Sequence, residues 1–303
     1  MNKEKINEQN EVKKLSLKND VVFKELFSKK GNEIFLKDFL SDLLNINIKK
    51  IEIQKDASLT REIVSEKFGI LDIKATLDNE KIVDIEMQMS DCKEMLDRAL
   101  YYSSKLISSQ LISGDEYKKL KPVIVIVILN FNLLAFDEYI TETLIVSKEH
   151  PNYELIDKLK MYFIELPKFR KKKCDIEKKT DQWLVFIDGE NEKGVKEVME
   201  KNKVIKKADK ELEYLTGDEE VRWLAEYRER ALKEKNSFYN STLREGREKG
   251  IREGMKEGMK EGIKEGIKEE KFNIAKKMLE KKYTPEQIAD ITSLSIDEIK
   301  NIK

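Results

Sequence analysis

Hydrophobic and polar residues alternate in two neighbouring segments, 71–77 and 83–89. A period of two is typical of β-strands, and the polar residues 78–80 between the segments predict a turn, so the two segments form a hairpin. Residues directly opposite each other in a hairpin share a face. Only a three-residue loop keeps one face apolar throughout, and this register places Asp72 opposite Glu86.

Spacings of three and four predict helices on either side of this hairpin. Apolar residues recur at these spacings in three segments, 20–27, 34–44 and 95–111. Asn19 or Asp20 is the expected N-cap of the first helix. The run VIVIVIL at 123–129 lacks alternation, which favours a strand buried on both faces. With a strand within 51–59, this order predicts a sheet covered by helices, of α/β or mixed α+β class.

Beyond residue 137 the pattern predicts mostly helix as far as residue 243. Segment 244–269 then repeats every four residues, with glycine, an apolar residue and glutamate each recurring at a fixed place. Each glycine costs a helix about 1 kcal/mol relative to alanine, which favours a flexible linker or partly frayed helix. In a helix, however, the apolar column drifts only about 40° per repeat and could contact another helix in a right-handed supercoil. Both alternatives remain open.

Two capping boxes follow, at residues 284–287 and 295–298, and predict two short helices joined by a turn. Such a pair resembles a helix-turn-helix. The last helix is short and rich in Asp and Glu, which repel phosphate. A small packing module is therefore favoured over a DNA reader.

Composition narrows the possible chemistry. The chain has 303 residues, with 59 Lys and Arg against 59 Asp and Glu, so its formal net charge is zero and nucleic-acid binding would need local patches. Two cysteines, Cys92 and Cys174, are too few for a disulfide framework or a four-cysteine zinc site, and one histidine, His150, excludes histidine-based triads. The longest apolar run, of about seven residues, is too short to span a bilayer. We expect a soluble cytoplasmic protein without a membrane segment.

One basic cluster stands out, KFRKKK at 168–173. It could contact backbone phosphates, or it could be a solvated loop.

The predicted hairpin carries candidate chemistry on its polar face. Asp72 and Glu86 would repel each other there unless a cation lay between them, and oxygen ligands suit Mg²⁺, Mn²⁺ or Ca²⁺. Gln88, opposite Ile70 and on the same face as Glu86, could orient water or phosphate but cannot act as a base. Lys74 could stabilise transition-state charge, or it could pair with Asp84 directly opposite. A solvated polar face is the alternative for the two carboxylates.

Several segments together resemble one family. They are NDVVFKELF (19–27), GILDIKA (69–75), IVDIEMQ (82–88), RALYYSSKL (98–106), SGDEYKKLKPVIVIVIL (113–129) and the repeat tail. In this order they resemble the Rpn family of recombination-promoting nucleases and transposases, within the PD-(D/E)XK nuclease superfamily. The resemblance covers roughly residues 15–300. It implies a restriction-endonuclease-like core, αβββαβ, followed by a helical region and the Gly-Glu-Lys repeat tail, and it implies divalent-metal-dependent DNA cleavage.

The resemblance also suggests roles for individual residues. Asp72 matches the superfamily's metal-binding aspartate and Glu86 its second acidic ligand. Gln88 stands where the superfamily usually has lysine, which leaves open the strength of catalysis and the source of positive charge.

Two further pairs match family helices. Asp20, with Lys24, matches the opening helix, where Asp20 could cap the helix or contact the site from outside. Arg98 and Tyr102 match the helix after the hairpin. Arg98 could bind phosphate or neutralise a carboxylate of the core.

These patterns predict four parts: a nuclease-like domain at 15–190, a helical extension at 191–243, the repeat at 244–270, and a small helical module at 271–303. The leading hypothesis is a divalent-metal-dependent DNA endonuclease with little sequence selectivity, acting in DNA recombination, mobile-element movement or defence. The alternative is a non-catalytic DNA-binding or oligomeric assembly protein that keeps the nuclease fold. An RNase would use the same site, and the repeat tail could join copies into a homo-oligomer.

Overall fold

The computed structural model describes residues 14–54, 72–91, 94–172 and 174–302. The chain divides into two compact units, Met1–Glu234 and Lys235–Lys303. Each unit is described by itself below.

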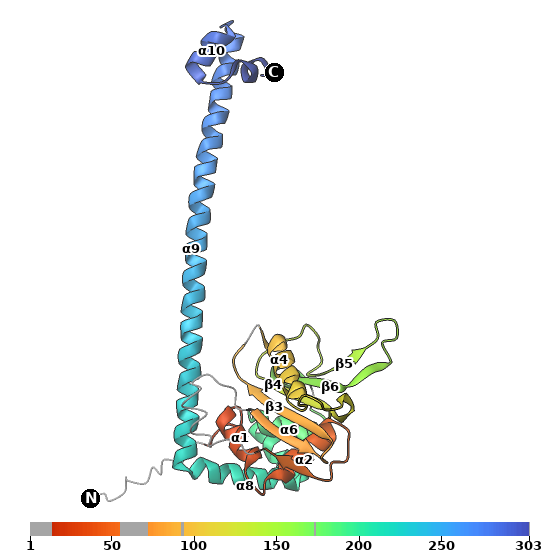
Figure 1. Cartoon of the computed structure of the whole chain (residues 1–303). Coiled ribbons are helices and arrows are strands. Elements are labelled where there is room, and N and C mark those ends of the chain that lie inside the picture. The colour runs from red at the N-terminus through yellow and green to blue at the C-terminus, as the bar shows by residue number, and fades with distance from the viewer. Residues whose placement is uncertain (1–13, 55–71, 92–93, 173, 303) are drawn as a thin grey trace, which may run out of the picture. The chain divides into compact units, whose positions relative to one another are not determined.

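A six-stranded mixed sheet forms the centre of the first unit, in the order β1-β2-β3-β4-β6-β5 (Figure 1). Its strands are β1 Ile51–Ile53, β2 Asp72–Leu77, β3 Lys81–Gln88, β4 Val123–Leu129, β5 Ile140–Val146 and β6 Glu154–Glu165. Strand β4 runs parallel to both β3 and β6, and the other neighbouring strands are antiparallel. All seven residues of β4 are buried, which confirms the prediction for this apolar run.

The predicted hairpin register is confirmed. Asp72 pairs with Glu86 and Lys74 with Asp84, while the predicted partner of Gln88, Ile70, lies outside the described residues. The turn needs positive φ at Asp78 (50°) and Asn79 (59°), and Asn and Asp are the non-glycine residues that tolerate this conformation best. The Asp78 carboxylate also accepts hydrogen bonds from the backbone N–H groups of residues 49 and 50, which holds the turn against the strand β1 end.

One face of the sheet is covered by several helices around a single large core. These helices are α1 Asp20–Ser28, α2 Glu33–Leu43, α6 Lys179–Asp188, α7 Glu192–Lys201 and α8 Lys203–Gly217. Trp183 of α6 is fully buried at the centre, with the rings of Phe27, Phe35 and Phe39 between 5.7 and 6.4 Å away. Its indole N–H donates to Asp38, 3.0 Å away. Helices α7 and α8 share this core with the sheet. The domain boundaries predicted from the sequence stay predictions.

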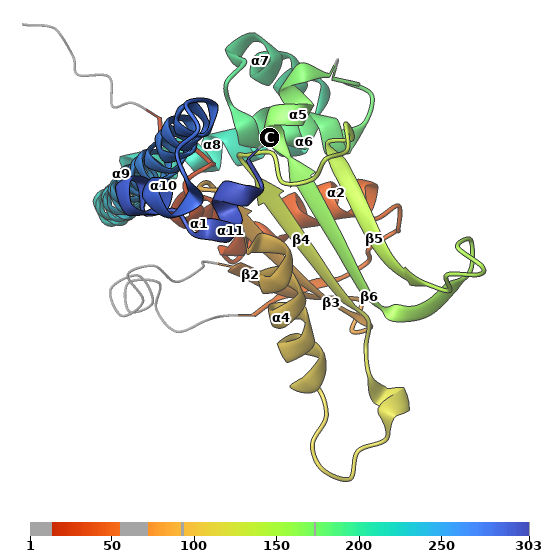
Figure 2. The same cartoon turned by 90° about the horizontal axis from the view of Figure 1, so that it is seen from above.

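The opposite face of the sheet carries helix α4, Met95–Ser108 (Figure 2). A second cluster joins α4 to the other face of β4, through Met95, Ala99, Val125 and Val127. Two short helices complete this unit, η1 Tyr117–Lys119 and α5 Leu166–Lys171. The mixed α/β class predicted from the sequence is therefore confirmed, with β4 as the strand buried between two helical layers.

The prediction of mostly helix beyond residue 137 is wrong for β5 and β6. Apolar residues in β6 fall at 155, 156, 159 and 161–164, and five of them (155, 156, 159, 162 and 163) follow a helical spacing. The β-branched residues of β5, with the sequence ITETLIV, were the local sign of a strand. Pairing of β6 with β4 on one side and β5 on the other decides the outcome.

The second unit contains most of one long helix, α9, Glu219–Glu280, which begins in the first unit. The repeat segment is thus continuous helix, not a flexible linker. Two short helices follow, α10 Pro285–Thr292 and α11 Ile296–Lys300, and both predicted capping boxes are present. They pack on the end of α9 around Ala275, Ile288, Leu294 and Ile299. Within the described parts of the chain, no helix is long and apolar enough to cross a membrane.

Candidate active site

Two carboxylates of β3 lie in the layer between the sheet and α4. Asp84 and Glu86 are each only 5% exposed, while their neighbours Val83, Ile85 and Met87 belong to the large core on the other face. On the neighbouring strand β4, Val125 lies beside Asp84 and Val127 beside Glu86, and both valines pack against α4. Burial beside apolar side chains disfavours an isolated carboxylate, so these groups require compensating positive charge.

Arg98 of α4 supplies positive charge to Glu86. Its Nη2 lies 3.5 Å from the Glu86 Oε1, and the two side chains are 26% and 7% exposed. Of the two roles predicted for Arg98, the structure shows neutralisation of a core carboxylate.

The backbone places Asp72 directly opposite Glu86, and Lys74 directly opposite Asp84. Positions 72, 74, 84 and 86 therefore belong to the same face of the hairpin, as the alternation of strand residues requires. For Asp72 the structure describes the backbone only. The strand register thus places the backbone positions of the predicted site residues in β2 and β3 opposite each other, on the face of the sheet that α4 covers.

Gln88 follows Glu86 on the same face, at the end of β3. Its amide nitrogen donates to the Ser90 carbonyl oxygen at 3.1 Å, and its backbone carbonyl accepts from the Asn130 N–H at 3.0 Å. These bonds hold the side-chain amide at the strand end and tie that end to the residue after β4. A neutral amide in this position can orient a ligand but cannot take a proton.

Asp84 is an acidic residue of this face that the sequence reasoning treated only as a partner of Lys74. Its spacing of two from Glu86, in the pattern Asp-Ile-Glu-Met-Gln, was the available signal. Carboxylate and amide oxygens, such as those of Asp84, Glu86 and Gln88, are the type of donor that Mg²⁺ or a similar hard cation prefers. Among side chains that the structure describes, no group of three or more His, Cys, Asp or Glu is placed to hold a metal ion.

Asp20 has a partner that neither predicted role anticipated. Its carboxylate, buried at the start of α1, accepts a hydrogen bond of 2.7 Å from Nε of Arg228 in α9, and both residues are less than 10% exposed. Burial raises the pKa of the Asp20 carboxyl, and Arg228 opposes that shift. The N-cap is Asn19, whose side chain accepts from the Val21 N–H. Lys24, one helical turn further along, is also buried.

Tyr102 lies on α4 beside Tyr101, with ring centroids 5.5 Å apart. It shares a flank of the helix with Arg98, one turn away. Tyr102 thus lies on the same helix surface as Arg98, one turn further from Glu86.

The basic cluster at 168–172 is not a solvated loop over its described residues. Lys168 donates to the buried Glu165 and to the Leu134 carbonyl. Arg170 forms an ion pair of 2.6 Å with Asp188. Both cations are used inside the fold, which weakens the alternative role in phosphate binding.

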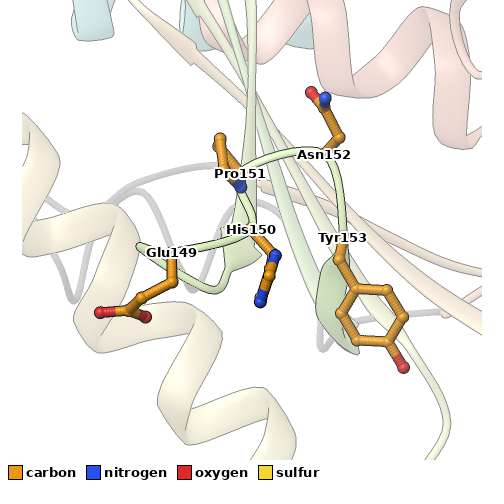
Figure 3. A pocket seen from close by; sticks show the side chains of 5 residues that line it. All are labelled: Glu149, His150, Pro151, Asn152 and Tyr153. Carbon is orange, nitrogen blue, oxygen red and sulfur yellow. The ribbon is translucent and has the colours of Figure 1, made fainter.

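A hollow at the turn between β5 and β6 is lined by Glu149, His150, Pro151, Asn152 and Tyr153 (Figure 3). These are consecutive residues of a single turn, and Figure 3 shows their side chains pointing in different directions. The hollow contains the only histidine of the chain. All residues that line the hollow come from this one turn, and they do not form a cluster of reactive side chains around the histidine.

Comparison with known proteins gives a family match. A family model described as a PD-(D/E)XK nuclease family transposase matches residues 17–242, which is more than half of the chain and includes every candidate site residue. No curated protein and no solved structure matches the chain. The match ends just before the four-residue repeat of α9.

Proposed function

Because the chain belongs to the PD-(D/E)XK nuclease family of transposases, we propose that it is a divalent-metal-dependent DNA endonuclease acting in DNA recombination, mobile-element movement or defence. The observation that carries this proposal is the pairing of Asp72 with Glu86 across the hairpin, on the face that also holds Asp84 and Arg98. We expect this cleavage to have little sequence selectivity.

In this proposal Asp72 and Glu86 hold Mg²⁺ or a similar ion, with Asp84 close to both along β3. A divalent ion bound there supplies Lewis-acid polarisation of the phosphodiester and a hydroxide-like water at neutral pH. Gln88 orients the attacking water or a phosphate oxygen through its amide. Lys74 and Arg98 stabilise negative charge that develops on the phosphate. Arg98 also neutralises Glu86 before substrate arrives, which lowers the cost of burying that carboxylate.

Nicking of supercoiled plasmid in Mg²⁺ or Mn²⁺ tests the assignment. We expect Asp72→Asn and Glu86→Gln to abolish nicking, because each removes one of the two charged ligands. Glu80→Gln is the matched control, because Glu80 is an exposed acid in the turn of the same hairpin. Equal nicking by all four proteins contradicts the assignment.

Metal binding gives a readout that does not depend on activity. Calorimetric titration with Mn²⁺ should show a site in the wild type and in Glu80→Gln that is lost in Glu86→Gln. An RNA of the same sequence, assayed in parallel with the DNA, decides between DNase and RNase activity.

The alternative role in assembly is favoured by one observation on α9. Five apolar residues of the repeat are 53–71% exposed along the helix: Ile251, Met255, Met259, Ile263 and Ile267. We infer that this column contacts the same column of a second copy, since water is a poor environment for a regular apolar stripe. Deleting residues 244–303 should then reduce the number of chains per particle, which light scattering gives as the measured mass divided by the mass of one chain. An unchanged number of chains per particle excludes the repeat as the association element.

A further inference from the structure

One flank of α4 combines two cations with two tyrosines. Tyr101 and Tyr102 each lie three or four residues from both Arg98 and Lys105, so the four residues lie along the same side of the helix. Met95, Ala99 and Ser103 form the buried side that packs on the sheet. The flank therefore lies beside the packed face and remains accessible.

Both tyrosines expose aromatic surface to solvent. Tyr101 is 64% exposed and Tyr102 is 37% exposed, and their rings meet edge to face at an interplanar angle of 72°. This pairing limits the motion of each ring and leaves flat aromatic surface open to a ligand. Lys105 is exposed one turn further along.

The flank begins at the candidate active site. Arg98 lies 3.5 Å from Glu86, and Lys105 is about 10.5 Å further along the helix axis. That length corresponds to about three stacked nucleotides at about 3.4 Å each. A strand held at the carboxylates could therefore continue along α4 without a change of direction.

Charge and aromatic character together select the kind of ligand. Lys105 attracts phosphate at one end of the flank, Arg98 pairs with Glu86 at the other, and the exposed aromatic rings between them can stack on bases. Bases inside an intact duplex are already stacked and cannot meet a tyrosine ring. A purely apolar protein partner would leave Lys105 unpaired at the contact.

We propose that this flank of α4 binds unpaired nucleotides of a DNA strand, with Tyr101 and Tyr102 stacking on bases and Lys105 contacting phosphate. The inference rests on the proposed nuclease function and names its substrate class: single-stranded DNA, or DNA with locally opened strands. Arg98 then acts at the junction between this surface and the carboxylates of β3.

Fluorescence anisotropy with a labelled 20-nucleotide single strand of mixed sequence tests the proposal. The buffer contains EDTA, so that binding is measured without cleavage. Because one lost stacking contact is worth about 1–3 kcal/mol, Tyr101→Ala should weaken binding about five- to 150-fold, while Tyr101→Trp should retain it. Leu100→Ala is the matched control, because Leu100 is 51% exposed on the other flank of the same helix.

Two further measurements separate stacking from general charge attraction. Lys105→Gln should reduce the slope of log affinity against log salt by about 0.7, the value for one phosphate contact on a single strand. The duplex of the same sequence should bind Tyr101→Ala within twofold of the wild type. An unchanged single-strand affinity in Tyr101→Ala, or an equal loss for duplex, overturns the proposal.

Failure of this proposal is distinguishable from failure of the proposed function. Plasmid nicking that requires Glu86, together with unchanged single-strand binding by Tyr101→Ala, leaves the nuclease and removes the α4 surface. Tyrosine-dependent binding without nicking leaves the surface and removes the nuclease.

Discussion

The ion pair between Asp20 and Arg228 gives the sharpest test of the fold. It joins the first described helix to α9 through a contact of 2.7 Å, with side chains only 8% and 6% exposed. Asp20→Asn leaves the arginine buried without its counter-charge, and arginine does not lose its proton in proteins. Breaking such a pair costs about 3–5 kcal/mol, because the remaining charge is uncompensated.

Arg228→Met should cost less than Asp20→Asn. Burial already raises the pKa of the Asp20 carboxyl, so the stranded acid can take up a proton. A raised folded-state pKa stabilises the protein below the unfolded pKa and loses that contribution as the pH rises. Arg228→Met should therefore become less stable, relative to the wild type, from acidic to neutral pH.

Urea unfolding followed by the fluorescence of buried Trp183 measures these effects in the first unit. Lys14→Met is the matched control, because the Lys14–Asp209 pair is partly exposed and worth at most about 1 kcal/mol. A loss below about 1 kcal/mol in Asp20→Asn, or a pH-independent effect of Arg228→Met, refutes the reasoning.

Three other substitutions test separate features by urea or thermal unfolding. Ile126→Ala, at a fully buried site in β4, should cost about 2–5 kcal/mol. Gly258→Ala should stabilise α9 by about 1 kcal/mol, since nothing lies within 4 Å of an added methyl group; a loss of stability would indicate a contact there. Asp38→Asn should flatten the acid-side loss of stability. Burial raises the pKa of the Asp38 carboxyl, but hydrogen bonds from Asn202, Lys179 and Trp183 outweigh burial and hold that pKa below its usual value, so the stabilising contribution of this carboxylate disappears as the pH falls.

The hairpin could be predicted from sequence because its signal is local. Alternation over residues 71–89 fixes both the faces and the register, and a slip by one residue would bury Asp84 and Glu86 in the large core. The buried strand β4 was equally clear, since seven apolar residues in a row need cover on both faces. These elements place the candidate carboxylates.

Non-local contacts decided what the sequence did not reveal. Part of the apolar spacing in β6 resembles that of a helix, and pairing with β4 on one side and β5 on the other makes this segment a strand. Arg228 lies 208 residues from Asp20, so no local pattern could connect them. The choice of Arg98 as the partner of Glu86 depended in the same way on how α4 crosses the sheet.

The same ion pair has a consequence for synthesis on the ribosome. Helix α1 emerges early, but the guanidinium that compensates its buried acid is made 208 residues later. At about 5–20 residues per second, that interval is about 10–40 seconds. The first unit therefore cannot complete its native packing until translation has passed the start of α9, and a nascent chain stopped near residue 190 would hold Asp20 without its cation.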